Sequence, residues 1–322
     1  MLELVSKLTV TGCVCALLAA QTIPPTYGQP LTPRIVANVQ LALKAGDLAT
    51  AEGLAEQFRR ANGNTPEALD ALGWVARGEL AARQIDKAQR TSSAILQNAQ
   101  IALATRPVDA EPYLPLALGT AYEVQAEALY VQGKRAAALQ VLQQARVQWR
   151  DSSLADRLQK NINLLLLEGR PMPLLRETEW IGPKPADPAA RRGKVLLLFF
   201  WAHWCADCKA DAPVIAKLAT EMKARGLVVI APTRLYGFTV EDEHAPAAKE
   251  TPFISRVFDR YYSQIPVAGV PLDAGNFHRF GASTTPTIVL VDRRGIVRLY
   301  HPGLMNEEDL RAAIEPLLRG GR

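Results

Sequence analysis

Residues 201–213 read WAHWCADCKADAP and contain two cysteines, Cys205 and Cys208, separated by two residues. Directly before them, Val195–Trp201 reads VLLLFFW, a short apolar run typical of a strand that is buried on both faces of a sheet. From Ala206 onward, apolar residues recur at a spacing of about four, which predicts a helix. We therefore expect Cys205 at the point where a buried strand passes into a helix.

The positions of the two cysteines predict different roles for them. The unpaired amides and the dipole at a helix N-terminus stabilise a thiolate, which is the attacking species in disulfide exchange. This favours Cys205 as the nucleophile. Cys208 lies close to one helical turn further on, where we expect it to be better shielded yet within reach of the Cys205 sulfur. Cys208 is therefore predicted to be the resolving thiol.

Two motifs give the second half of the chain a specific resemblance to a known family. Trp-Cys-x-x-Cys followed by Lys209 and Pro213 resembles the active-site motif of the thioredoxin superfamily. Thr284-Thr285-Pro286-Thr287, followed by a strand-like run and a turn, is similar to the cis-proline loop that faces the dithiol in that family. The extra residues between the motifs, together with the N-terminal sequence, make the chain similar to TlpA-like thiol-disulfide oxidoreductases.

The resemblance implies an α/β thioredoxin-like fold and dithiol-disulfide exchange that needs no metal and no organic cofactor beyond the redox-active disulfide. It implies that a cis Thr285–Pro286 bond turns the Thr285 backbone toward Cys205, where an extended substrate pairs with it. The alternative is an ordinary trans-proline before a strand. Trp204 is predicted to shield the sulfur and to contact substrate.

Thioredoxins carry a buried acid before the motif that assists proton transfer, and Phe199 stands at that position here. The assisting group is therefore missing or comes from elsewhere. The candidates that we identify in the insertion are Glu241, Asp242, Glu243 and Asp259.

Two polar neighbours of the dithiol are predicted to modulate it. A carboxylate at Asp207 disfavours the thiolate and tilts the pair toward the reducing side, unless Asp207 is exposed and its charge is screened. His203 stabilises the thiolate if it is protonated, and the alternative is a surface residue or a substrate contact.

Residues 29–168 are rich in Ala, Leu and Gln, which favours several short antiparallel helices. Lys44–Ala51 resembles the turn between the paired helices of a tetratricopeptide-like repeat, and Gly133 with Ala138 echoes it. A middle copy around Ala88 lacks the glycine. Such an array either spaces or dimerises the enzyme, or it offers a concave surface that recruits a protein partner.

Residues 1–28 are interpreted as an export signal or an N-terminal anchor, because Lys7 precedes an apolar stretch too short to span a membrane. Val10–Cys13 resembles a lipobox, but the apolar run before Cys13 is short and continues beyond it, which argues against a lipid anchor. The protein is therefore expected outside the cytoplasm, in the periplasm, either soluble or anchored at its N-terminus.

The cysteine count and the charge exclude other classes. Cys13 and Cys15 fall within the interpreted signal, so Cys205 and Cys208 remain as an isolated pair that is expected to cycle between dithiol and disulfide. The four histidines have no zinc-finger spacing, which argues against a metal site. The net charge of +5 comes from 37 basic and 32 acidic residues that are interspersed, which does not indicate nucleic-acid binding.

The fold predicted from these patterns is an all-helical, repeat-like domain over 29–168 followed by an α/β thioredoxin-like domain over 169–322. Within the second domain we predict an opening strand within 174–181, a second buried strand over 226–231 and an insertion over about 233–269 with a helix at 250–262. A hairpin over 288–300 and a closing helix capped by Asn306 complete it.

The predicted function is thiol-disulfide oxidoreduction on protein disulfide substrates, more in the reducing than in the oxidising direction. A membrane electron donor or a thioredoxin-like partner is expected to reset the pair. Two alternatives remain: a peroxide-reducing redoxin, whose Pro-x-x-x-Thr-x-x-Cys setting is not found here, and a non-enzymatic helical adaptor with a vestigial redox domain.

Overall fold

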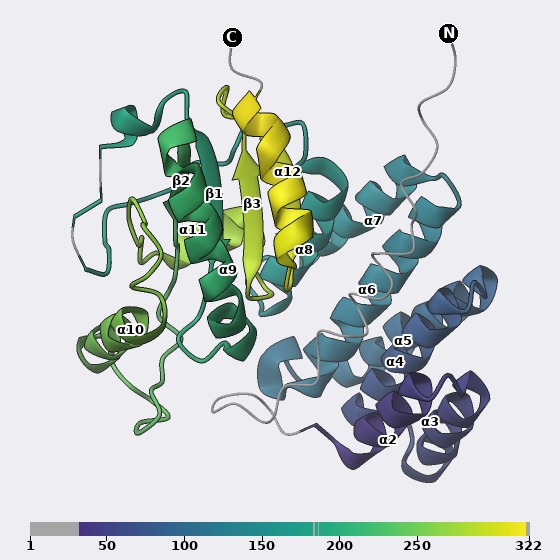
Figure 1. Ribbon diagram of the computed structural model, residues 1–322. Helices are drawn as coiled ribbons and strands as arrows, with labels where there is room; N and C mark the ends of the chain where they lie inside the picture. The colour runs from purple at the N-terminus through teal and green to yellow at the C-terminus, as the bar shows by residue number, and fades with distance from the viewer. Residues whose placement is uncertain (1–31, 183, 186, 320–322) are drawn as a thin grey trace, which may run out of the picture.

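The computed structural model describes residues 32–182, 184–185 and 187–319, and its first part is helical (Figure 1). The residues predicted to form an export signal lie outside the described residues. The helices of this part are α2 (Arg34–Lys44), α3 (Leu48–Asn62), α4 (Pro66–Ala81), α5 (Ile85–Leu103), α6 (Tyr113–Val131), α7 (Arg135–Gln148) and α8 (Leu154–Leu166), with a short 3₁₀ turn at Val108–Ala110. Among the described residues, none of the helices has both the length and the apolar character that crossing a membrane requires.

Helices α2 to α7 form three hairpins, and the turn within each hairpin is of the same type. In each, one residue has a positive φ, and the next residue donates its N–H to the carbonyl five positions earlier, which closes the first helix. The residues with positive φ are Gly46 (76°), Arg83 (61°) and Gly133 (76°). Arg83 thus occupies the place of the glycine that the middle copy lacks, so the turn is repeated although its sequence signal is not.

A four-stranded mixed sheet forms the centre of the second part, in the order β2-β1-β3-β4. Strand β1 (Val195–Phe200) runs parallel to β2 (Leu227–Ile230) and antiparallel to β3 (Thr287–Val291), which in turn pairs with β4 (Val297–Pro302). Alternate residues of β1 enter two different apolar clusters, so the strand is buried on both faces as its composition predicts.

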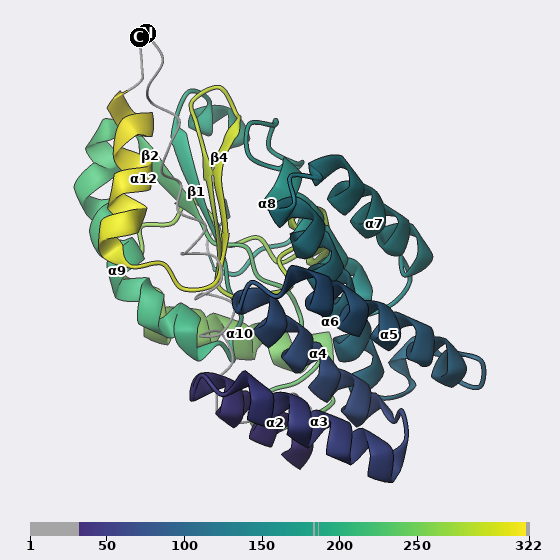
Figure 2. The same ribbon diagram turned by 90° about the vertical axis from the view of Figure 1, so that its right-hand side faces the viewer.

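Helices cover both faces of this sheet (Figures 1 and 2). On one face lie α9 (Ala206–Met222) and α12 (Glu307–Arg319), and α10 (Ala247–Tyr261) of the insertion joins the same apolar cluster. On the other face lies α11 (Ala274–Phe280), which packs against α8 of the helical part. Asn306 caps α12 as predicted, because its Oδ1 accepts the Asp309 N–H at 2.9 Å.

One expectation about the second part needs correction, and one helix of this part was not predicted. Residues 174–181 form no strand; they are held by single contacts such as the bridge between Trp180 and Pro271. The prolines that surround this segment explain the difference, because proline cannot donate to a continuous ladder. Helix α11 was not predicted from the sequence, although Asp273 caps it by accepting the Gly275 N–H at 2.6 Å.

Candidate functional site

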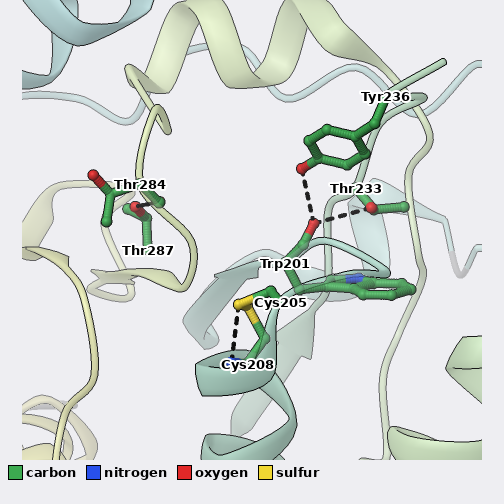
Figure 3. Close-up of a disulfide and its surroundings, with 7 residues drawn as sticks. All are labelled: Trp201, Cys205, Cys208, Thr233, Tyr236, Thr284 and Thr287. Carbon is green, nitrogen blue, oxygen red and sulfur yellow. Dashed lines mark hydrogen bonds between the residues drawn. A yellow bond between two sulfur atoms is a disulfide. The ribbon is translucent and has the colours of Figure 1, made fainter. Parts of the chain in front are cut away.

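The two cysteines lie at the N-terminus of α9, directly after β1. Cys205 is the N-cap residue, it forms a disulfide with Cys208, and its sulfur accepts the Cys208 N–H at 3.0 Å (Figure 3). This places a helix amide on the sulfur that we predict to be the nucleophile, where it favours the thiolate in the reduced form. Both residues are buried, with 1% of Cys205 and 0% of Cys208 exposed, so in the oxidised form the expected difference in shielding is absent.

The end of β1 is tied to the start of the insertion. Trp201 is fully buried, and its indole donates to the Ala231 carbonyl at 3.0 Å. The Trp201 carbonyl accepts the Thr233 hydroxyl at 3.0 Å and the Tyr236 hydroxyl at 3.5 Å (Figure 3). Two segments far apart in the sequence therefore meet beside the disulfide.

The proline loop lies on the other side of the disulfide from Tyr236 (Figure 3). The Thr285–Pro286 peptide bond is cis, as the sequence predicts, and Pro286 is buried. Thr287 donates its hydroxyl to the Thr284 carbonyl at 2.6 Å, and Gly303 donates its N–H to the Pro286 carbonyl at 2.8 Å. One hydrogen bond within the loop and one to the residue after β4 thus hold it in place.

His203 is not the exposed or charged residue that we considered from the sequence. It is 3% exposed and packs edge-on against the rings of Tyr236, Phe238 and Phe253, at 5.0 to 5.5 Å between centroids. Burial, with a further contribution from the charge of Lys209, lowers the pKa of His203 to about 4. A neutral imidazole at pH 7 cannot stabilise the thiolate by charge, so this part of the prediction is wrong.

The acid that the insertion buries is Glu250, at the first turn of α10. Its carboxylate accepts the N–H groups of Tyr236 at 2.6 Å and Gly237 at 2.8 Å, and its Oε1 lies 3.3 Å from Nε2 of His203. Burial raises its pKa, although the two backbone donors oppose this shift. Glu250 therefore holds the loop that carries Tyr236.

The four acids that the sequence suggested as assisting groups lie elsewhere. Glu241, Glu243 and Asp259 are exposed, and Asp242 pairs with Lys249 at 3.1 Å on the surface. A sequence signal did point to Glu250, since it precedes Ile254 and Phe258 at helical spacing on the buried side of α10.

Asp211 is a second buried acid, and it lies one helical turn after Cys208. It is 6% exposed, and its Oδ2 has no hydrogen-bond partner among the described residues. Burial raises its pKa to about 7, with a smaller contribution from Asp207, while the backbone N–H of Met305 opposes the shift. The sequence pattern contained this residue, because Asp211 precedes Ile215 and Leu218 on the buried face of α9.

Two further predicted residues lie at the edge of the site. Trp204 is half-buried, and its ring meets that of Tyr236 edge-on at 5.5 Å. Asp207 is half-buried between the two cysteines. In the described part of the chain, no group of three or more His, Cys, Asp and Glu side chains is placed to hold a metal ion.

Known proteins resemble the second part of the chain. A family model described as a thioredoxin-like domain matches residues 186–317. The thiol:disulfide interchange protein DsbE of Pseudomonas fluorescens biotype C is 29% identical over 140 residues, which cover 43% of this chain and 68% of that protein. The thiol-disulfide oxidoreductase ResA of Halalkalibacterium halodurans is 27% identical over 169 residues, 51% of this chain and 79% of its own.

A solved structure is similar to part of this chain. The thiol:disulfide interchange protein of the thioredoxin family from Chlorobium tepidum is 18% identical, with a TM-score of 0.37, over 47% of this chain and 99% of that one.

Proposed function

We propose that this protein, whose residues 186–317 form a thioredoxin-like domain homologous to thiol-disulfide oxidoreductases, reduces protein disulfides outside the cytoplasm through Cys205 and Cys208. The observation that carries the proposal is the Cys205 sulfur at the N-terminus of α9, 3.0 Å from the Cys208 amide. The extracytoplasmic location is supported by the composition of residues 1–28 and by the isolated cysteine pair.

The reaction begins from the reduced pair. The Cys205 thiolate attacks one sulfur of a substrate disulfide, the substrate S–S bond breaks, and the departing sulfur leaves as a thiolate that takes up a proton. The Cys208 thiol then loses its proton and attacks the Cys205 sulfur, which releases the second substrate sulfur as a thiolate and forms the Cys205–Cys208 disulfide. Two electrons pass from the protein to the substrate, and neither metal nor organic cofactor is needed.

Asp211 is suited to accept the proton that Cys208 loses in the second step. It is buried near Cys208, and a pKa of about 7 means that its proton occupancy changes in the working range of pH. This carboxylate takes the place of the acid that Phe199 replaces, although it comes from the helix and not from the strand. His203 and Glu250 shape the neighbouring loop.

We expect Asp211→Asn to slow release of substrate from the mixed disulfide by roughly tenfold at pH 8, because the amide cannot accept a proton. In the wild type, the rate should rise as pH increases through about 7, the pKa of Asp211, since only the ionised carboxylate is a base. The variant should lose this rise. Stopped-flow tryptophan fluorescence from pH 5 to 9 measures the rate.

Glu241→Gln, an exposed change of the same kind in the insertion, is the matched control and should keep the wild-type profile. An unchanged profile in Asp211→Asn would remove Asp211 from the mechanism without affecting the proposed role of the cysteines.

The direction of transfer is tested by the equilibrium reduction potential of the Cys205–Cys208 pair, titrated against dithiothreitol and glutathione buffers. We expect a value closer to that of thioredoxin, about −270 mV, than to that of a strong oxidant, about −120 mV. Such a potential requires an electron source, either a membrane donor or a thioredoxin-like partner. A value near −120 mV would mean that the protein oxidises its substrates.

A further inference from the structure

Helix α8 belongs to the helical part, yet it touches the segment that leads into the proline loop. The side-chain amide of Asn163 donates to the Phe280 carbonyl at 2.8 Å, and both groups are buried. On the other side, the hydroxyl of Tyr300 donates to the Gly281 carbonyl at 2.9 Å. The residues that precede Thr284 are therefore held between α8 and β4.

At Gly281, the backbone of the segment before the proline loop lies very close to the backbone of α8. Its φ of 58° is one that glycine favours, and a Cβ at this position would lie 2.5 Å from the backbone nitrogen of Lys160 in α8. Any larger residue must push α8 and the loop apart.

The first turn of α8 reaches the loop on the opposite side of the disulfide. Asp156 pairs with Arg234 at 3.3 Å and is also bound by His278 of α11. The Arg234 guanidinium lies 5.1 Å from the centre of the Tyr236 ring, which packs against Trp204 next to Cys205. A continuous set of contacts thus leads from α8 to the cysteine motif.

A buried ion cluster fixes α8 to the rest of the helical part. Glu123 of α6 accepts from Arg157 and Lys160 of α8, at 2.6 and 3.0 Å, and from Arg77 of α4 at 2.7 Å. Because breaking such buried pairs is costly, α8 holds one position relative to α4 and α6. Through α8, the positions of the loops that flank the disulfide therefore depend on the position of the helical part.

We infer that Asp156, Asn163 and Gly281 are positioning residues for substrate. Through their contacts, α8 sets the distance between the loop that carries Arg234 and Tyr236 and the proline loop of residues 284–287. The inference rests on the proposed function, since an extended substrate must fit between these loops to reach Cys205. The helical part is then a component of the catalytic unit, and not a separate spacer.

Two variants test this assignment, each with a matched control. Asp156→Asn removes the charge that holds Arg234, and Asp151→Asn makes the same change on an exposed side chain just before α8. Gly281→Ala forces α8 away, whereas Gly295→Ala adds a Cβ at another positive φ, 81°, where nothing lies within 4 Å. Asp156→Asn keeps the test decisive if Gly281→Ala fails to fold.

Steady-state kinetics are measured on folded protein with two substrates: a synthetic peptide of about ten residues with one disulfide, and 2-hydroxyethyl disulfide, which has no backbone to pair with the loop. We expect Asp156→Asn and Gly281→Ala to raise KM for the peptide about tenfold, with kcat and the rate on the small disulfide within about twofold of wild type. Both controls should behave as wild type. A purely structural role would lower the melting temperature without this split between substrates.

The inference is overturned if both variants are folded and keep the wild-type KM, or if the rates on the two disulfides fall equally. In either case an active wild type leaves the proposed function standing. A wild type that reduces neither disulfide would instead overturn the proposed function, and the inference with it.

Discussion

Replacement of Cys208 by alanine is expected to abolish turnover and to leave the protein linked to its substrate through Cys205. Without the second thiol, the mixed disulfide on Cys205 has no intramolecular route to resolution, because the sulfur that bonds to Cys205 in the oxidised protein is absent. Disulfide reduction should fall by at least about 10³-fold, because resolution then depends on a thiol from solution. Non-reducing electrophoresis and mass spectrometry of the adducts measure this outcome.

Cys205→Ala is the control, since it should lose activity without forming adducts. The pair of variants distinguishes the nucleophile from the resolving thiol, because Cys205 and Cys208 are equally buried and burial does not separate their roles. Adducts on Cys208 in the Cys205→Ala protein would reverse the assignment. A biological role that survives replacement of both cysteines, although disulfide reduction is lost, would favour the non-enzymatic helical adaptor.

Glu123→Gln is expected to lower the free energy of unfolding by about 3–5 kcal/mol at pH 7, the usual result of removing one partner from a buried ion pair. Although burial opposes ionisation, the charges of Arg157 and Lys160 hold the pKa of Glu123 well below its usual range. The glutamine would leave the cations of α4 and α8 buried without their counter-charge. Urea unfolding followed by circular dichroism at 222 nm measures the loss.

The stability that Glu123 contributes should decrease as pH falls. Because the pKa of Glu123 is lower in the folded than in the unfolded protein, its contribution to stability is present above its ordinary pKa of about 4.5 and is lost as pH falls below that value. The gap between wild type and Glu123→Gln should therefore narrow in acid. A gap that stays constant between pH 7 and pH 3 would contradict the ionic account.

Glu127→Gln provides the matched control, one turn along the same helix. Burial, with a contribution from Glu123, raises the pKa of Glu127, so ionisation at pH 7 is unfavourable in the folded state. The glutamine should therefore leave stability unchanged or slightly higher. A loss equal to that of Glu123→Gln would mean that α6 tolerates no amide at all, and that the ion cluster is not the cause.

The positions of the two cysteines proposed to be catalytic were predictable because they depend on local sequence. An apolar run of six residues followed by a helical pattern places Cys205 at a strand-helix junction in any fold that buries the strand. The same holds for the proline loop, the β3–β4 hairpin and the cap at Asn306, each of which is encoded within a few neighbouring residues. The helical character of residues 34–166 follows from composition and spacing in the same way.

The state of the polar residues around the disulfide was less accessible to sequence reasoning. His203 closely follows a strand, and its sequence neighbours do not show whether it is buried. Tyr236, Phe238 and Phe253 of the insertion pack against it, and burial lowers its pKa so that it is neutral at pH 7. Asp211 and Glu250 were at apolar helical positions that signalled burial, but their neighbours across the fold decide their pKa values.

For this protein, the sequence alone determined the helical character of residues 34–166, the position of the cysteine pair and the proline loop that faces it, because hydrophobic periodicity and short motifs act over a few residues. The tertiary structure decided which acid is buried beside Cys208, that Arg83 completes the middle hairpin, and that α8 connects the helical part to both loops of the site. These features depend on contacts such as Asn163 with Phe280, between residues 117 positions apart. A contact at that separation leaves no periodic trace in either segment, so it appears only when the chain is folded.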